Sequence, residues 1–367
     1  MRVGQTVSGA GTITHDLTAG LGEADVISVL AVDTVGGWVF FIASPGAPLE
    51  RYLYRAALTS AEQGPGAVER LTPAGAGAIG THSYQLAPAL LGSSDGVAYA
   101  VHSFSSFGQP GFTELVSLPE HKVIQPLVSN EALQHKLDAL SGGAVSLFNI
   151  DIAPFARDLP EGVSTSLDAY AIFPPGFEPS SAPAASAPLL VHVYGEPAGC
   201  TVSDSYGGYQ YLWHRLMAQR GFIVVSFDSR GTPSPKGRAW RKTAYKKIGI
   251  TANNDQAAAV LALLARWPCI DPAKVGIWGW SGGGSSTLQA MFRFPEIYKA
   301  GAAVAFIADQ RNYDTIYQER YMGVPDGSDD GWKDYIEGAM EPLPSPHIYS
   351  SSMHSAASLV CWHAGVR

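Results

Sequence analysis

The sequence predicts an α/β fold preceded by a segment built of β-strands, and three observations support this prediction. Up to about residue 142, short apolar runs alternate with Gly, Pro, Ser and Asp, as in sheets joined by turns. From about residue 143, strand-like runs alternate with helical stretches, which favours a largely parallel sheet covered by helices. Within this second part, a Gly-x-Ser-x-Gly sequence centred on Ser281 stands between an apolar run and a helical stretch.

The first part, residues 1–142, contains strand-like runs whose length and spacing are typical of a β-sandwich or a β-propeller. The clearest of them are Trp38–Ala43, Tyr52–Leu58 and Val97–His102. The similar stretches Leu17–Gly20 and Leu71–Pro73 each precede another strand-like run, at a spacing suited to one four-stranded blade. The length leaves room for about two or three such blades, fewer than a closed propeller needs, so a β-sandwich and part of a propeller both remain possible.

The second part, residues 143–367, contains the strands and helices of the α/β fold. The strand candidates are Val145–Ile152, Leu167–Phe173, Leu189–Tyr194, Phe222–Asp228 and Val275–Trp280, and the clearest helix is Asn254–Arg266. The last of these strands, followed by Ser281 and a helix, has the order of a nucleophile elbow. In such a turn a serine hydroxyl is exposed beside backbone N–H groups that can stabilise a developing negative charge.

Composition and charge exclude several classes of protein. The 367 residues are 46% hydrophobic and 15% charged, as in a soluble protein with a sizeable core. The net charge is −8, and we interpret the densest basic cluster, Arg238–Lys247, as a solvated helix face, so we expect no nucleic-acid partner.

We interpret Cys200, Cys269 and Cys361 as small core residues. No stretch resembles a signal peptide or a membrane span, which predicts a cytoplasmic protein.

The glycine-rich stretches do not indicate a cofactor. The turn Ser281–Gly284 lacks the lysine that a phosphate-binding loop needs. The stretch Gly75–Gly80 has neither a clear strand before it nor a helix after it, and we interpret it as a loop. We therefore expect neither a cofactor nor a metal ion.

The elbow sequence GWSGGG resembles that of the prolyl oligopeptidase group of serine peptidases, most closely its dipeptidyl peptidase IV branch. Matching stretches occur in the same order at Val191–Pro197 (VHVYGEP), Phe227–Gly231 (FDSRG) and Tyr313–Gly323 (YDTIYQERYMG). The resemblance extends from about residue 20 to about residue 325. It implies an α/β-hydrolase fold preceded by the last blades of a β-propeller. It also implies a peptide substrate, cleavage after proline or alanine through an acyl-enzyme, and a homodimer.

The resemblance assigns roles to individual residues. Ser281 would be the nucleophile, and the amide of Gly282 with the hydroxyl of Tyr194 would form the oxyanion hole. Tyr313 and Tyr317, four residues apart on an expected helix, would line a small apolar pocket for a proline ring. Ile307 stands where the family places another apolar pocket residue.

Three positions depart from the family pattern near this site. Gly282 replaces an aromatic residue, so we expect one wall of the pocket to be missing. Glu196 interrupts the usual Y-G-G-P, and its carboxylate would oppose a negative intermediate unless it turned outward. Gln310 stands where the best-known members often have tryptophan.

The catalytic Asp and His are not recognisable in this sequence. After Gly323 neither the family's H-G-x-x-D-D stretch nor its D-x-x-H follows, and none of His347, His354 and His363 stands in a matching loop. We expect a hydrolase fold incomplete at its C-terminal end, a chain truncated at both ends relative to the family, and almost no peptidase activity. Two alternatives remain: an esterase of the same fold and a non-catalytic, hydrolase-like binding protein.

Overall fold

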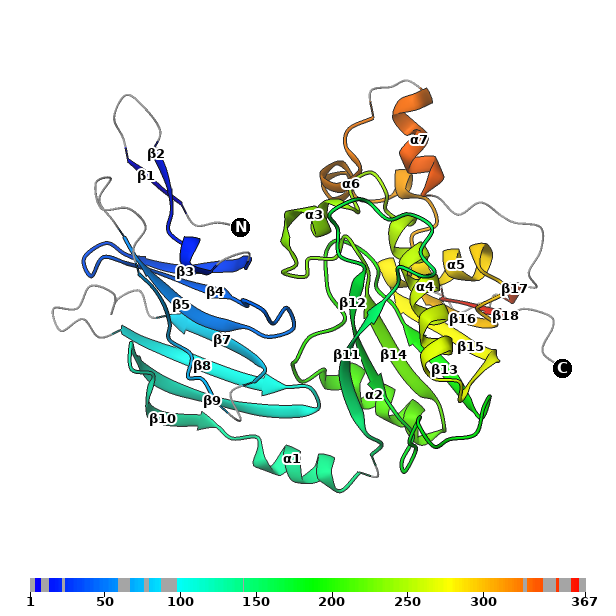
Figure 1. Cartoon of the computed structure of the whole chain (residues 1–367), viewed down its shortest axis with the longest axis horizontal. Coiled ribbons are helices and arrows are strands. Elements are labelled where there is room, and N and C mark those ends of the chain that lie inside the picture. The colour runs from blue at the N-terminus through cyan, green and yellow to red at the C-terminus, as the bar shows by residue number, and fades with distance from the viewer. Residues whose placement is uncertain are drawn as a thin grey trace. The chain divides into compact units, whose positions relative to one another are not determined.

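The chain folds into two compact units, seen in a computed structural model (Figure 1). The structure describes residues 4–7, 13–21, 24–58, 67–75, 79–86, 98–140, 142–325, 329–338, 348–349 and 358–362. The first unit comprises residues 1–140 with the short segments 203–211 and 235–237. The second unit comprises residues 141–202, 212–234 and 238–367.

The first unit contains two antiparallel sheets of four strands each, in which consecutive strands are neighbours. The first sheet consists of β3 (Val26–Asp33), β4 (Trp38–Ala43), β5 (Tyr52–Ala57) and β6 (Val68–Arg70). The second consists of β7 (Thr81–Leu86), β8 (Ala98–Ser106), β9 (Gln109–Leu118) and β10 (Lys122–Val128). The remaining elements are the hairpin β1 (Gly4–Val7) and β2 (Ile13–Asp16), the 3-10 turn η1 (Ala19–Leu21) and helix α1 (Glu131–Asp138).

The two similar sequence stretches occupy corresponding places before the two sheets. Leu17 and Thr18 precede β3, and Leu71 and Thr72 precede β7. All four are buried, the leucines at 1% and 4% exposure. Each leucine joins the apolar cluster of a sheet, so the repeated sequence marks a repeated packing unit.

The second unit is built around an eight-stranded sheet with the order β11-β12-β14-β13-β15-β16-β18-β17. Its strands are β11 (Val145–Asp151), β12 (Ser166–Ile172), β13 (Ala187–His192), β14 (Ile223–Asp228), β15 (Ile270–Trp280), β16 (Ala300–Val304), β17 (Ile348–Tyr349) and β18 (Ser358–Trp362). Only the pairings among β14, β13, β15 and β16 are parallel. The prediction of a largely parallel sheet is therefore wrong. No helix joins β11 to β12, and without such a crossover neighbouring strands pair antiparallel.

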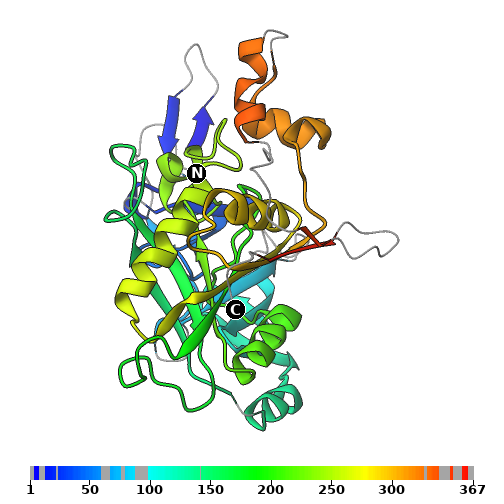
Figure 2. The same ribbon diagram turned by 90° about the vertical axis from the view of Figure 1, so that its right-hand side faces the viewer.

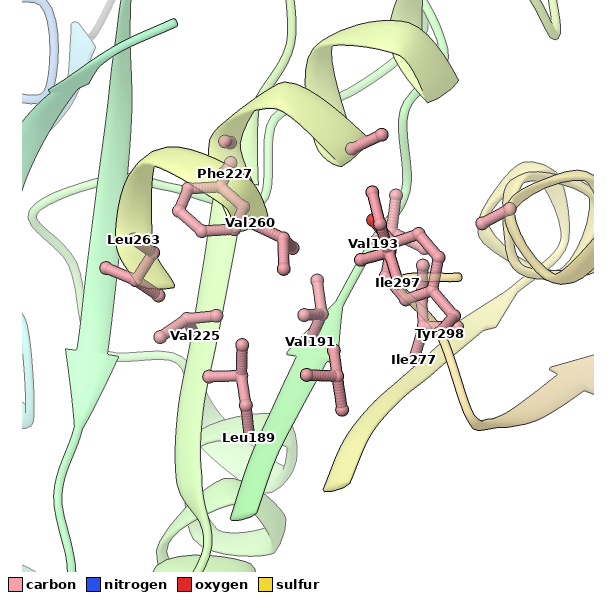
Figure 3. Packing of buried hydrophobic residues seen from close by; sticks show 14 of the residues in the cluster. Leu189, Val191, Val193, Val225, Phe227, Val260, Leu263, Ile277, Ile297 and Tyr298 are labelled. Atoms are coloured by element: carbon pink, nitrogen blue, oxygen red, sulfur yellow. The ribbon is translucent and has the colours of Figure 1, made fainter. Parts of the chain in front are cut away.

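Helices follow the parallel strands, and α4 and α5 pack on the sheet. The helices are α2 (Gly208–Gln219), α3 (Gly237–Lys242), α4 (Thr251–Arg266), α5 (Gly282–Arg293), α6 (Thr315–Met322) and α7 (Asp329–Glu337), with a 3-10 turn η3 (Gln310–Asn312). Figure 3 shows Val260 and Leu263 of α4 facing Val225 of β14 and Val191 of β13. Helix α5 packs on β15 and β16. This continuous core fixes the start of α5 relative to the ends of the parallel strands.

Helices α6 and α7 lie beside each other in both views (Figures 1 and 2). Met322 of α6 and Tyr335 of α7 share a small apolar cluster with Ile248, and the Tyr335 hydroxyl donates to the Gly323 carbonyl at 2.7 Å. No helix among the described residues has both the length and the apolar character that crossing a bilayer requires.

The cysteines are not all in the core. Cys269 is buried, as expected, but Cys200 is exposed, so that part of the prediction is wrong. Cys200 lies in the loop between β13 and α2. The stretch Gly75–Gly80 lies partly outside the described residues.

Candidate active site

Ser281 lies at the sharp turn between the end of β15 and the start of α5. Its φ of 55° and ψ of −121° are strained for a residue that carries a Cβ atom. The Ser281 amide donates to the Val304 carbonyl of the neighbouring strand β16 at 2.9 Å, which holds the turn in place. The residue is half-buried. The turn therefore has the backbone of a nucleophile elbow.

The glycines beside Ser281 allow a close approach to the segment that follows β13. A Cβ atom at Gly279 would lie 2.4 Å from the carbonyl oxygen of Val193, and one at Gly283 would lie 2.1 Å from the same oxygen. Real Cβ contacts are essentially never shorter than 3.0 Å. A side chain at either position would push α5 away from this backbone. The Gly-x-Ser-x-Gly spacing thus reflects main-chain packing as well as the turn itself.

The Gly282 amide and the Tyr194 main chain lie at the start of α5. The Gly282 amide belongs to the first residue of the helix, and such amides have no acceptor within their own helix. A Cβ atom at Gly283 would lie 3.2 Å from the Cα of Tyr194, so the Tyr194 main chain is packed against the elbow. Ser286 of α5 donates its hydroxyl to the Tyr194 carbonyl at 3.2 Å, which anchors this segment.

Ile307 lies in the loop after β16 and is held against α5 by Ser285. The Ser285 hydroxyl accepts from the Ile307 amide at 2.8 Å and donates to the Ile307 carbonyl at 2.9 Å. Gln310, farther along the same segment, is 1% exposed and accepts a hydrogen bond from Gln318 of α6. Gln310 and Gln318 thus form a buried amide pair.

The two predicted pocket tyrosines are neighbours, but one helix does not carry both. Helix α6 begins at Thr315, because Asp314 caps it and accepts from the amides of Ile316 and Tyr317 at 2.8 and 3.3 Å. Tyr313 therefore precedes the helix, and the prediction of a shared helix is wrong. The rings of Tyr313 and Tyr317 still meet edge to face, with centroids 5.6 Å apart.

Glu196 occupies the space that a side chain on residue 282 would need. A Cβ atom at Gly282 would lie 2.3 Å from the Glu196 Cδ and 2.6 Å from each carboxylate oxygen. The wall expected to be missing is therefore filled, and the prediction of an open side is wrong. The carboxylate does not turn outward either. Glu196 is 5% exposed, and its Oε2 accepts from the Tyr317 hydroxyl at 2.6 Å.

The charge of Glu196 influences the groups around it. Burial raises the pKa of Glu196, while the hydrogen bond from Tyr317 acts in the opposite direction. Burial and then the charge of Glu196 raise the pKa of the Tyr194 phenol, which keeps its hydroxyl protonated and able to donate. Within the described ranges, no basic side chain pairs with Glu196. The raised pKa means that the Glu196 carboxyl keeps its proton to a higher pH than an exposed glutamate does.

A hydrogen-bonded general base for Ser281 is not found in the described part of the chain. No imidazole or carboxylate there bonds to the Ser281 hydroxyl. His347, His354 and His363 lie outside the described residues.

Sequence reasoning missed Ser285 and Ser286, which anchor the two loops that flank the elbow. The available signal was a pair of small hydroxyl side chains near the start of the helix after the nucleophile. Such residues can bond to neighbouring backbone, but their sequence position does not say to which segment.

Two family models match this chain. The prolyl oligopeptidase family matches residues 209–340, and the N-terminal region of dipeptidyl peptidase IV matches residues 6–110. Together they cover most of both units, including α5 with Ser281, the sheet β3–β6 and the strands β7 and β8 of the second sheet.

Individual proteins and one solved structure agree with these matches. Probable dipeptidyl-aminopeptidase B of Emericella nidulans is 32% identical over 316 residues, which are 85% of this chain and 31% of that protein. Venom dipeptidyl peptidase 4 of Vespa velutina is 29% identical over 334 residues, covering 86% of this chain and 38% of that protein. The crystal structure of Porphyromonas gingivalis dipeptidyl peptidase 4 superposes with a TM-score of 0.72 at 28% identity, over 87% of this chain and 40% of that chain.

The chain spans about a third of the length of the curated relatives it matches. The shared part includes the elbow, the segment with Tyr194 and the sheets that precede them. The strained serine, the glycines that seat it and these similarities lead to one conclusion: the chain belongs to the prolyl oligopeptidase family, on its dipeptidyl peptidase IV-like branch.

Proposed function

We propose that this chain carries the nucleophile, oxyanion hole and substrate pocket of a serine peptidase that cleaves short peptides after proline or alanine. The observation that carries the proposal is the elbow: Ser281 is held at a φ of 55° at the start of α5, with Tyr194 anchored beside it. Strained residues persist where the surrounding structure holds them for a function. A reactive serine hydroxyl facing a substrate carbonyl is such a function.

In the proposed reaction the Ser281 Oγ attacks the carbonyl carbon of the substrate while its proton passes to a general base. The carbonyl π electrons move to the oxygen, and the resulting oxyanion accepts hydrogen bonds from the Gly282 amide and the Tyr194 hydroxyl. When the oxyanion collapses, the C–N bond breaks and the departing amine takes the proton. Water then hydrolyses the ester and releases Ser281.

The proposed pocket favours a small apolar residue next to the cleaved bond. Tyr313, Tyr317 and Ile307 supply aromatic and aliphatic surface, and the Glu196 carboxyl fills the side that Gly282 leaves open. The related proteins are named dipeptidyl peptidases, which supports a peptide as the substrate. A homodimer, also implied by the family, is part of the proposal, and light scattering coupled to size exclusion tests it.

The test is covalent labelling of the purified chain with a fluorophosphonate, followed by intact mass measurement and peptide mapping. We expect one adduct per chain, at Ser281, and none in Ser281→Ala. Ser180→Ala, which removes an exposed hydroxyl, is the matched control and should label like the wild type. Chain unfolded in urea should not label, because the reactivity depends on the elbow geometry.

The outcomes separate the proposal from its alternatives. Well-folded protein that does not label at Ser281 would contradict it and favour a non-catalytic binding protein. Labelled protein that hydrolyses simple esters but no peptides would favour an esterase. Because no hydrogen-bonded base is found among the described residues, we expect slow release of p-nitroaniline from Xaa-Pro substrates. Release that persists in Ser281→Ala would also contradict the proposal.

A further inference from the structure

Three side chains that commonly bind metal ions gather on one face of the sheet β7–β10, within the first unit. His102 of β8 and Glu114 of β9 are direct cross-strand partners. His121 stands in the turn between β9 and β10. One ligand atom from each of the three lies within 4.8 Å of the others. Cross-strand partners point to the same side of a sheet, so the register itself places the first two together.

The separations are close to those of a metal site. The His102 Nδ1 and the Glu114 Oε1 are 3.0 Å apart, and the rings of His102 and His121 meet edge-on with centroids 4.8 Å apart. Ligands around a tetrahedral zinc ion, with bonds of about 2.0–2.2 Å, lie about 3.3 Å from one another. The ligand atoms of His102, Glu114 and His121 lie within 4.8 Å of one another, a limit about 1.5 Å longer than the separation around zinc. Binding of an ion would require the half-buried Glu114 and His121 side chains to move closer to His102.

Each histidine also has a hydrogen-bond partner at one ring nitrogen. The His102 Nε2 is 2.9 Å from the His82 Nδ1, and the His121 Nε2 is 2.9 Å from the Tyr84 hydroxyl. The Tyr84 hydroxyl is in turn 2.9 Å from the Thr72 Oγ1. Histidines that bind metals almost always use their second nitrogen in this way, which fixes the ring. In His102 the remaining nitrogen is the one that faces Glu114.

Burial suits a site that is protected but reachable. The side chain of His102 is 3% exposed and that of Glu114 is 14% exposed, so Glu114 is the more accessible of these two ligands. Burial, followed by the neighbouring His121, lowers the pKa of His102 to about 4. The ring is therefore neutral at neutral pH, the form in which imidazole binds a metal.

We propose that His102, Glu114 and His121 bind one divalent transition-metal ion, with zinc preferred and water completing the coordination. Two imidazoles and one carboxylate are donors that zinc accepts readily, and three protein ligands leave one position open. This proposal departs from the expectation of no metal. It does not depend on the peptidase function, because all of its ligands lie in the first unit.

The test is a zinc titration of the chelator-treated chain, read by competition with a chromophoric zinc indicator. Glu114→Gln keeps the shape of the side chain and removes the charged ligand. His121→Asn removes a ligand at a φ of 54°, a left-handed conformation that asparagine tolerates. Glu120→Gln, in the same turn, and His135→Gln, on α1, change exposed residues of the same types and serve as matched controls.

We expect one zinc ion per wild-type chain and an affinity weakened at least about tenfold in Glu114→Gln and in His121→Asn. The two controls should bind as the wild type does. Cobalt bound in place of zinc should show visible d–d bands without a thiolate charge-transfer band, which excludes the exposed Cys200 as a ligand. Thermal unfolding without metal checks that the variants fold.

Three results would overturn the proposal. The first is that the folded wild type fails to take up one zinc ion per chain. The second is that the ligand variants bind zinc as tightly as the wild type does, and the third is a thiolate charge-transfer band in the cobalt spectrum. If the ligand variants lower the unfolding temperature while the wild type binds no zinc, the cluster is a hydrogen-bonded network only.

Discussion

At the scale of single residues, the two departures from the family pattern at Glu196 and Gly282 lie in contact with each other. Glu196 and Gly282 are far apart in the sequence, yet a Cβ atom on Gly282 would collide with the Glu196 carboxylate. The same carboxylate accepts from Tyr317, one of the proposed pocket residues. Glu196 thus lies between Gly282 of the proposed oxyanion hole and Tyr317 of the proposed pocket.

Tyr194→Phe tests the proposed oxyanion hole. Removing one preorganised donor typically slows acyl transfer by about 10²–10³-fold. We expect fluorophosphonate labelling of Ser281 to slow by about a hundredfold, with the urea unfolding midpoint unchanged. Tyr209→Phe removes a phenol from a residue that is 93% exposed and should label at the wild-type rate. Equal rates for Tyr194→Phe and wild type would show that this hydroxyl is not a donor to the reacting group.

Glu196→Gln tests the buried carboxyl through the pH dependence of stability. The pKa of Glu196 is raised above its ordinary value of 4.5, so the native state holds this proton more tightly than the unfolded chain does. The stabilisation that protonated Glu196 provides is complete below pH 4.5 and is lost as the pH rises through the raised pKa of the native state. The neighbouring phenols of Tyr194 and Tyr317 have raised pKa values and do not titrate in this range.

Because glutamine stays neutral, the free energy of unfolding of Glu196→Gln relative to wild type should rise from pH 4.5 to pH 7.5. Its amide oxygen can still accept from Tyr317, so the variant keeps the packing of the site. Urea denaturation at several pH values provides the measurement. Parallel curves for the two proteins would show that Glu196 ionises equally easily in both states.

At the scale of elements, the first turn of α5 packs against two kinds of neighbour. A side chain lies beside Gly282 and can move, whereas backbone lies beside Gly283 and cannot move easily. Gly282→Ala would meet a side chain, the Glu196 carboxylate, whereas Gly283→Ala would meet the backbone oxygen of Val193 at 2.1 Å. We expect each substitution to lower the free energy of unfolding by about 1–3 kcal/mol. Adding Glu196→Ala should rescue Gly282→Ala, with a coupling of about 1 kcal/mol, and leave Gly283→Ala unrescued. Strictly additive effects at 196 and 282 in urea unfolding would argue against the contact.

At the scale of the whole molecule, a buried ion pair ties the second unit together. Arg230 follows β14, and its Nη2 lies 2.6 Å from the Oδ1 of Asp255 on α4. The Arg230 amide also donates to the Asp255 Oδ2 at 2.9 Å, and the two side chains are 1% and 0% exposed. The family-like stretch that contains Arg230 therefore has a structural role in joining the sheet to its longest described helix.

Asp255→Asn should destabilise the chain by about 3–5 kcal/mol, because it leaves the Arg230 charge buried without a counter-ion. Asp158→Asn is the matched control. Asp158 pairs with Lys247 at 3.3 Å, with side chains that are 54% and 49% exposed. Exposed pairs contribute at most about 1 kcal/mol, so this variant should unfold at nearly the wild-type urea concentration. Similar losses in both variants would show that burial does not set the strength of the Arg230–Asp255 pair.

The sequence by itself determined the features that depend on neighbouring residues. Alternation of apolar residues indicated the strands, and the glycines around Ser281 indicated the elbow, because steric limits on the backbone act within a few positions. The predicted α/β-hydrolase fold after propeller-like sheets is confirmed by the family matches and the similar solved structure. The positions of Ser281 and of the β15–α5 junction could therefore be read without any tertiary contact.

The tertiary structure decided which distant residues meet. Only the packing of α5 on the segment after β13 brings Glu196 onto Gly282, and only the cap at Asp314 leaves Tyr313 outside α6. The register of β8 and β9 places His102 beside Glu114. The physical reason is common to all three: strand register and helix packing are set by the whole core, so local periodicity cannot specify contacts between residues far apart in the chain.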